Sequence, residues 1–168
     1  FNLSEDFIQK IVQERFINYI KNGYVDNALE IKETFNLPED FINSSETQEA
    51  IRERFISYIK GERINDALEI KKAFNLSEDF INSSETEKAA QEGFISRIKI
   101  GLVNDALKIK ETFSLPKDFI QKAAQEGFIS CIRSGHVDDA LEIKETFNLP
   151  EEIINSLEAP EAAQELSL

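Results

Sequence analysis

The segment Phe35-Asn36-Leu37-Pro38-Glu39-Asp40-Phe41 decides how this chain folds, because versions of it recur along the whole sequence. They begin at residues 1, 35, 74, 113 and 147, at spacings of 34, 39, 39 and 34 residues. The two long units, 35–73 and 74–112, are identical at 25 of 39 positions. A fixed period of this length indicates stacked copies of one supersecondary unit. We therefore predict a single repeat array over 1–168, with repeats at 1–34, 35–73, 74–112 and 113–146 and a partial repeat at 147–168.

The phenylalanines support this array, because all 13 of them occupy repeat-equivalent positions. An aromatic set at fixed repeat spacing is typical of a core rather than of a cofactor site. Each buried phenylalanine stabilises the fold by about 1.5–3 kcal/mol, so we expect the same contacts to hold every repeat. The three classes are Phe1, Phe35, Phe74, Phe113 and Phe147; Phe7, Phe41, Phe80 and Phe119; and Phe16, Phe55, Phe94 and Phe128.

The second half of each repeat predicts an amphipathic helix. Its first copy, 25–35, reads Val-Asp-Asn-Ala-Leu-Glu-Ile-Lys-Glu-Thr-Phe, and later copies begin at residues 64, 103 and 137. At about 100° per residue, one broad face collects the apolar positions Val25, Ala28, Leu29, Ile31 and Phe35. Aspartates near the first turn suit the helix dipole, and a glycine before each copy ends the preceding helix. These residues are Asp26, Asp66, Asp105 and Asp138, and Gly23, Gly61, Gly101 and Gly135.

The first half of each repeat predicts another helix, which contains Phe16-Ile17-Asn18-Tyr19-Ile20 or a copy of it. Short repeats open this helix at Ser4 or Pro116 and continue it to the glycine turn. In the long repeats, the inserted residues 43–47 and 82–86 interrupt it. Capping-box spacing there predicts a short helix, a break and a newly capped helix. The pairs with this spacing are Ser45 with Gln48 and Ser84 with Glu87.

The predicted fold is therefore all-α, an α-solenoid of tandem helical hairpins. Both ends of the chain fall inside repeats, since Phe1-Asn2-Leu3 matches the end of a second helix, and 162–165 match the first helix at 89–92. A solenoid normally needs polar capping repeats at its ends. We expect the natural protein to be longer, or its ends to be covered by a neighbour.

Composition narrows the function. With 19 Lys and Arg against 32 Asp and Glu, the formal net charge is −13, and 41% of the residues are hydrophobic. That apolar fraction is too high for a disordered acidic tail. The single cysteine, Cys131, excludes an internal disulfide and a thiolate zinc cluster, and it favours a cytoplasmic location. No run of about 18 apolar residues is present, so we expect no membrane span.

Candidate catalytic residues are few. His136 is the only histidine, and together with Cys131 it raises the hypothesis of a thiol–imidazole couple. No other repeat carries this pair, and the two residues lie on either side of a turn. The sequence has no phosphate-binding glycine loop, metal triad or nucleophile elbow. We expect no enzyme activity, no cofactor and no metal.

The segment Gly135-His136-Val137-Asp138-Asp139-Ala140-Leu141-Glu142 resembles the turn and second helix of tetratricopeptide and pentatricopeptide repeats. The likeness covers this portion of all four repeats, and the 34-residue period of the short units agrees with it. The 39-residue units exceed both families. The resemblance implies a right-handed superhelix whose first helices line a concave binding face.

The two families imply different ligands, protein for tetratricopeptide arrays and single-stranded RNA for pentatricopeptide arrays. Reading one base per repeat needs polar side chains that vary between repeats. The equivalent position falls either on a constant row of glutamates or on two arginines followed by two glycines. Glutamates repel phosphate, and the net charge of −13 disfavours nucleic acid overall. The two rows are Glu14, Glu53, Glu92 and Glu126, and Arg15, Arg54, Gly93 and Gly127.

We therefore expect a non-enzymatic scaffold that binds a protein or peptide, with a basic partner favoured by the acidic field. The alternatives are end-to-end self-association of the repeats into a structural assembly, and binding of single-stranded RNA. Arginine and tyrosine are favoured at binding hot spots, and Tyr19→Ala with Tyr58→Ala is expected to weaken partner capture without loss of helix. The predicted contact set is Arg15, Tyr19, Arg54, Tyr58 and Arg97.

Overall fold

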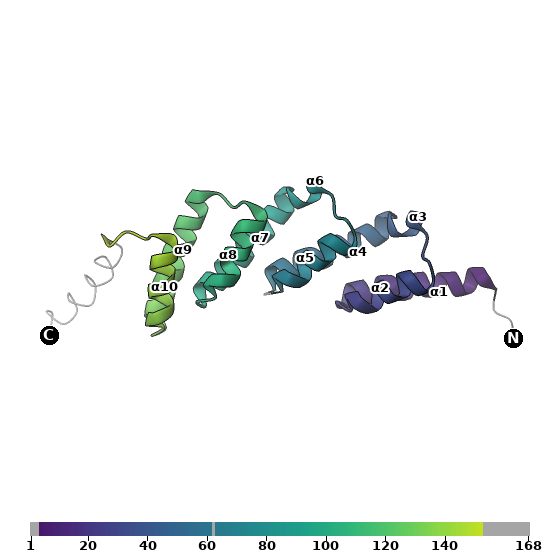
Figure 1. Cartoon of the computed structure of the whole chain (residues 1–168), viewed down its shortest axis with the longest axis horizontal. Helices are drawn as coiled ribbons and strands as arrows, with labels where there is room; N and C mark the ends of the chain where they lie inside the picture. Colours follow the sequence, from purple (N-terminus) through teal and green to yellow (C-terminus); the bar gives the residue numbers. More distant parts are fainter. Residues whose placement is uncertain (1–3, 62, 153–168) are drawn as a thin grey trace. The chain divides into compact units, whose positions relative to one another are not determined.

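A computed structural model describes residues 4–61 and 63–152. Within these ranges the regular structure consists of ten α-helices, with no β-strand (Figure 1). The prediction of an all-α fold is confirmed to this extent. The helices form two compact units, residues 1–80 and 81–168. The end of the partial repeat, 153–168, lies outside the described residues, as does Phe1.

The first unit contains two helical hairpins. Hairpin 1 pairs α1 (Glu5–Asn22) with α2 (Val25–Thr34), and hairpin 2 pairs α4 (Ser45–Lys60) with α5 (Ile64–Ala73). The short helix α3 (Glu39–Ile42) connects them, and α1 packs against α4. A second short helix, α6 (Glu78–Ile81), lies where the unit ends. The first helices of consecutive hairpins are thus neighbours.

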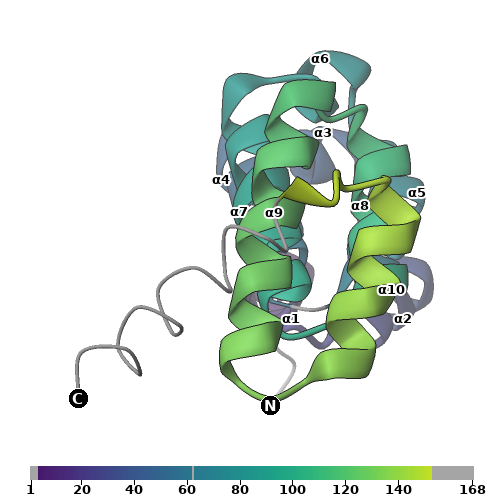
Figure 2. The ribbon, with the colours of Figure 1, turned by 90° about the vertical axis from the view of Figure 1, so that its left-hand side faces the viewer.

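The second unit repeats this plan. Hairpin 3 pairs α7 (Ser84–Lys99) with α8 (Val103–Phe113), and hairpin 4 pairs α9 (Lys117–Arg133) with α10 (Val137–Phe147). Figure 2 shows α9 and α10 side by side, joined by a tight turn. First helix packs on first helix, α7 on α9, and second on second, α8 on α10.

Glycine turns separate the paired helices, as predicted. Gly23 ends α1 with φ of 82°, a left-handed conformation that favours glycine, and its N–H donates to the Ile20 carbonyl. Gly101 and Gly135 have the same conformation, whereas Gly61 does not. A second left-handed position, which the repeat pattern does not predict, follows each second helix. It is occupied by Asn36, Asn75, Ser114 and Asn148, and asparagine tolerates this backbone better than most residues.

The break in the long repeats is confirmed, but the predicted cap is wrong by one residue. Ser44, not Ser45, precedes α4, and its Oγ accepts from the Thr47 N–H. Ser83 caps α7 in the same way through Thr86. In each case a threonine, not Gln or Glu, stands three residues after the cap, so the structure contains the serine half of a capping box.

The central phenylalanines form the core, as predicted: Phe16, Phe55 and Phe94 are 0% exposed and Phe128 is 2% exposed. The buried face of the second helices is narrower than the predicted one. In α2 only Ala28 is fully buried, while Phe35 is exposed. Leu68 and Leu141, which are equivalent to Leu29, are exposed as well. The leucine position therefore lies at the edge of the buried face, since Leu29 and Leu107 are half-buried.

The boundary between the two units differs from the repeat boundary. Repeat three begins at residue 74, but the first unit continues through Phe80. The reason is packing: the Phe74 ring meets Phe16 at 6.1 Å, and the Phe80 ring meets Phe55 at 5.7 Å. The segment that opens a sequence repeat thus completes the preceding hairpin.

Candidate interaction surface

Two aromatic rings from the following hairpin enclose the central phenylalanine of a first helix. In the first unit, Phe41 and Phe74 lie 5.8 and 6.1 Å from Phe16, edge to face. In the second unit, Phe119 and Phe147 lie 6.0 and 5.8 Å from Phe94. Such ring pairs add about 0.5–1.5 kcal/mol beyond the area they bury. We call each enclosing pair an aromatic clamp.

Beside the clamp of the first unit, α4 grips the end of α1 through polar groups. Arg54 Nε donates to the Ile20 carbonyl at 3.0 Å, and Tyr58 Oη donates to the Gly23 carbonyl at 3.0 Å. These carbonyls lie at the negative end of the α1 dipole, where a cation is favoured. A Cβ on Gly23 would lie 2.9 Å from Tyr58 Oη, so this glycine serves both the turn and the contact.

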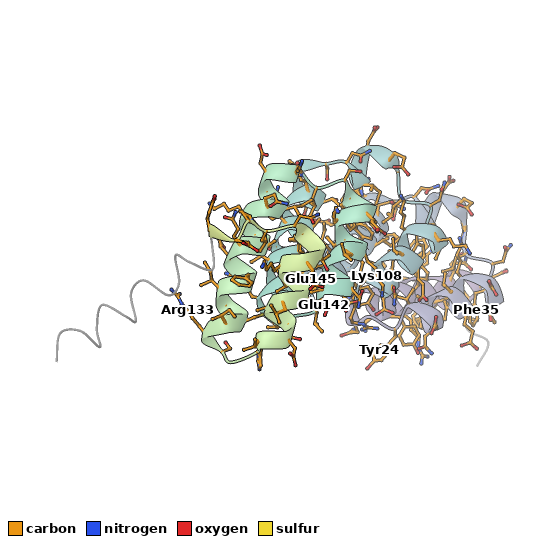
Figure 3. All side chains as sticks on the ribbon, turned by 60° about the vertical axis from the view of Figure 1, so that its left-hand side comes forward. Tyr24, Phe35, Lys108, Arg133, Glu142 and Glu145 are labelled. Atoms are coloured by element: carbon orange, nitrogen blue, oxygen red, sulfur yellow. The ribbon has the colours of Figure 1, made fainter. Side chains whose placement is uncertain are left out.

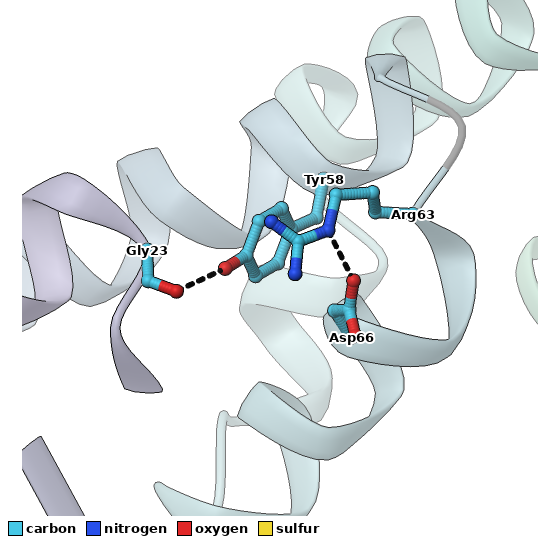
Figure 4. A network of polar contacts seen from close by, with 4 residues as sticks. All are labelled: Gly23, Tyr58, Arg63 and Asp66. Atoms are coloured by element: carbon cyan, nitrogen blue, oxygen red, sulfur yellow. Dashed lines mark hydrogen bonds and ion pairs between the residues drawn. The ribbon is translucent and has the colours of Figure 1, made fainter. Parts of the chain in front are cut away.

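Two guanidinium groups lie close to the Tyr58 ring. Arg63 lies 4.4 Å and Arg54 5.5 Å from its centroid, within the range of cation–π attraction. Arg63 also donates to the Asp66 carboxylate, and this hydrogen bond raises the pKa of Arg63 above its ordinary value. Figure 4 shows the resulting chain of contacts from Asp66 through Arg63 and Tyr58 to Gly23.

The second unit uses smaller residues at the same two positions. Gly127 replaces Arg54, and a Cβ there would lie 1.9 Å from Ile98 Cγ2, so α9 approaches α7 closely. Cys131 replaces Tyr58, and its thiol points at the Ile98 and Lys99 carbonyls, at 3.8 and 3.9 Å. Ser130 Oγ donates to the Lys99 carbonyl at 3.3 Å. The chain therefore contains an Arg/Tyr junction and a Gly/Cys junction.

Hairpin 1 presents the same surface without a hairpin on it. Phe7 and Phe35, the clamp positions, are 48% and 46% exposed, against 8% for Phe74 and 4% for Phe147. Figure 3 labels Phe35 on hairpin 1. Between α1 and α2 lies a groove of about 270 Å³ lined by Ile11, Arg15, Tyr19 and Phe35, among others. We call Phe7, Ile11, Arg15, Tyr19 and Phe35 the outer face of hairpin 1.

The structure separates the predicted contact set. Arg15 and Tyr19 lie together on the outer face, with Arg15 Nε 3.2 Å from the Tyr19 hydroxyl. Tyr58 is 3% exposed and, with Arg54, holds the junction of the first unit. Arg97 is fully buried, and its Nη1 donates to the Gly93 carbonyl at 2.8 Å. From the sequence, Tyr58→Ala is expected to weaken partner capture without loss of helix. Because this substitution removes a packed ring, it would change stability as well as binding.

Sequence reasoning missed Phe7, Ile11 and Phe35 as surface residues. The repeat spacing assigns Phe7 and Phe35 to the core, and no sequence pattern singles out Ile11. In the structure, every later repeat buries or partly covers the counterparts of all three residues. Periodicity carries no signal for their exposure, because it does not show which faces a neighbouring hairpin covers.

Removal of the Tyr58 hydroxyl is expected to weaken the first unit. In Tyr58→Phe the ring remains, but the Gly23 carbonyl loses its donor, so the free energy of unfolding falls by about 0.5–1.5 kcal/mol. Urea denaturation followed by far-ultraviolet circular dichroism measures this change. Tyr24→Phe is the matched control, because Tyr24 is 59% exposed. Equal destabilisation by the two variants would contradict the role given to Tyr58.

The thiol–imidazole hypothesis finds no support in the site geometry. Cys131 is fully buried and directed at the carbonyls of α7, whereas His136 is exposed in the turn before α10. The contact between them is a backbone one, from the His136 N–H to the Cys131 carbonyl at 2.8 Å. Burial, and then the nearby charge of Asp139, raise the pKa of the Cys131 thiol, which lowers its reactivity.

Alkaline pH is expected to destabilise the second unit through Cys131. The folded chain keeps the thiol proton to a higher pH than the unfolded chain, whose thiol ionises near pH 8.5. The contribution of the buried thiol to stability is therefore fully present below about pH 8.5, and it is lost as the pH rises through the pKa of the folded state. The measurement compares urea midpoints of the wild type and Cys131→Ala between pH 7 and 9.5. A wild-type midpoint that falls no faster than that of the variant would contradict this prediction.

Within residues 4–61 and 63–152, no group of three or more His, Cys, Asp or Glu side chains is placed to hold a metal ion. No helix in the part of the chain that the structure describes is long and apolar enough to cross a membrane. Comparison with protein-family models, curated proteins and solved structures finds no match to this chain. The candidate site therefore rests on the internal repeats alone.

Proposed function

We propose that this chain is a non-enzymatic scaffold that binds another protein through the outer face of hairpin 1. One observation carries the proposal: the clamp residues Phe7 and Phe35 are about half exposed, while Phe74 and Phe147 are buried by a neighbouring hairpin. Exposed aromatic and apolar side chains beside Arg and Tyr are typical of protein-binding sites.

The proposal also covers how the hairpins are arranged, where the protein acts and which partner it binds. The hairpins continue as a right-handed α-solenoid of the tetratricopeptide- or pentatricopeptide-like kind, in the cytoplasm, with a basic partner favoured by the charge of −13. RNA is disfavoured by the same net charge, because the electrostatic attraction that dominates nucleic-acid affinity is unfavourable overall. Self-association remains the second candidate, since the exposed face has counterparts that bind hairpins of this same chain.

Affinity capture from the native source extract tests the proposal. The chain is compared with an Ile11→Glu/Phe35→Glu variant, which places charges on positions that are already exposed, so the fold is expected to survive. We expect a defined protein to be retained by the wild type, to survive nuclease treatment and to be lost from the variant. The matched control is Leu141→Glu on α10, where the leucine is 47% exposed.

Two results would overturn the proposal. Equal retention by the wild type and the double variant would remove the outer face as the binding site. Retention that disappears after nuclease treatment would favour RNA as the ligand, in agreement with the pentatricopeptide-like alternative.

A further inference from the structure

The outer face of hairpin 1 matches two surfaces whose occupants are visible in the same chain. The corresponding face of hairpin 2 is covered by α1, and that of hairpin 4 by α7. In both cases the occupant is the first helix of a hairpin. The central phenylalanine of that first helix, Phe16 or Phe94, lies between the two rings of the clamp. The carbonyls at the end of the same helix accept from side chains of the hairpin that carries the clamp.

The exposed clamp has the parts needed for the same occupant. Phe7 is equivalent to Phe41 and Phe119, and Phe35 is equivalent to Phe74 and Phe147. The rings of these equivalents lie 5.8–6.1 Å from the phenylalanine they enclose. An apolar patch alone would accept many partners, but two rings at positions whose equivalents flank a phenylalanine favour an aromatic side chain.

The polar residues of the outer face, Arg15 and Tyr19, are suited to bind the carbonyl end of a docked helix. Arg15 and Tyr19 occupy the repeat positions of Arg54 and Tyr58. Arg54 and Tyr58 donate to carbonyls at the end of α1. On hairpin 1 the guanidinium of Arg15 is exposed and lies 5.4 Å from the Tyr19 ring centroid. The corresponding distance from Arg54 to Tyr58 is 5.5 Å. A cation and a hydroxyl donor at this place complement the carbonyl end of a helix.

One position departs from the internal junctions. Ile11 stands where hairpins 2 and 4 have Ala50 and Ala123, which are 1% and 4% exposed. Ile11 is 45% exposed and lines the groove. It adds apolar area, and replacing it by a small residue makes the face more like the internal ones.

We propose that the outer face of hairpin 1 docks a helical hairpin of this chain's own repeat type, in the Arg/Tyr mode seen between α1 and α4. This inference rests on the proposed function and names its partner from the contacts of the face, in place of the basic partner that the net charge of −13 favours. The docked hairpin places a central phenylalanine between Phe7 and Phe35, and its first helix ends at a glycine turn whose carbonyls accept from Arg15 and Tyr19. The site is a continuation of the internal interface.

A chain lengthened by one repeat provides the test. A copy of residues 1–34 is added before Phe1, so that the added Thr34 joins Phe1 as Thr34 joins Phe35 in the native chain. The native Ile11 is changed to Cys in both the lengthened and the original chain, and maleimide labelling of this thiol is followed by peptide mass mapping. The added copy contains no cysteine, and Cys131 is mapped separately.

We expect labelling at position 11 to slow at least about tenfold in the lengthened chain, since a covered thiol reacts only when the interface opens. In a parallel pair of chains with Leu141→Cys instead, the rate is expected to stay within about twofold, because α10 is far along the sequence from the graft. Adding Phe35→Glu to the lengthened chain is expected to restore fast labelling, since the clamp then lacks one ring.

Three results would overturn the inference: an unchanged labelling rate at position 11, no gain in helical circular dichroism from the added 34 residues, or protection that persists in Phe35→Glu. These outcomes are distinct from failure of the proposed function. If the Ile11→Glu/Phe35→Glu variant loses its captured protein but the added hairpin does not protect position 11, the face binds a protein of another kind, and only this inference falls.

Discussion

Replacing Phe16 by alanine is expected to lower the free energy of unfolding of the first unit by about 3–5 kcal/mol. Phe16 is fully buried, and its ring contacts both Phe41 and Phe74. Truncation therefore removes the transfer free energy of one ring and two aromatic contacts, and it leaves a cavity between Phe41 and Phe74. Phe94→Ala is expected to have an effect of the same size on the second unit, where Phe119 and Phe147 form the clamp.

The matched control is Phe35→Ala, which makes the same chemical change on a ring that is 46% exposed. Because no phenylalanine of residues 4–61 and 63–152 is seen between the rings of the clamp that Phe35 belongs to, we expect a loss of less than about 1 kcal/mol. Urea denaturation of the three variants, followed by circular dichroism, gives the comparison. A loss in Phe16→Ala no larger than that in Phe35→Ala would show that the clamp is not the main contact between hairpins.

This contrast shows what periodicity predicts and what it cannot. The three phenylalanine classes, the helices and the left-handed glycine turns follow from local sequence, because helix propensity, capping and turn geometry act over a few residues. The burial of a particular phenylalanine also depends on whether a neighbouring hairpin is present. Phe35 and Phe74 occupy equivalent positions in the sequence, yet their exposed fractions are 46% and 8%.

The roles of the predicted contact residues were beyond sequence reasoning for a related reason. Arg54 and Tyr58 look like a binding pair, and they are one, but they bind the end of α1 within the chain. That contact joins residues 34 and 35 positions apart. Only the packing of α1 on α4 reveals it. The same packing leaves Arg15 and Tyr19 as the pair on an uncovered face.

Gly127→Arg, which introduces the residue of the other junction, is expected to destabilise the second unit by more than about 3 kcal/mol. A Cβ at residue 127 would already lie 1.9 Å from Ile98 Cγ2 and 3.0 Å from the Ile98 carbonyl oxygen. Arginine adds a long charged side chain at this buried position, where it would have to displace α7 from α9. Gly127→Ala tests the first carbon alone. We expect it to cost about 1–3 kcal/mol of overpacking, partly offset by about 1 kcal/mol of helix propensity.

A double-mutant cycle identifies the cause. Ile98→Leu moves the branch of the side chain away from Cβ and removes the Cγ2 methyl group while it keeps the carbon count. Gly127→Ala should therefore cost less in the Ile98→Leu background than in the wild type, by about 0.5 kcal/mol or more. Full recovery is not expected, because the Ile98 carbonyl remains 3.0 Å from the new Cβ. Strictly additive free energies would mean that helix approach at Gly127 does not depend on Ile98. Coupling would instead show that the Cγ2 methyl group of Ile98 is the contact that favours glycine at residue 127, where α9 approaches α7.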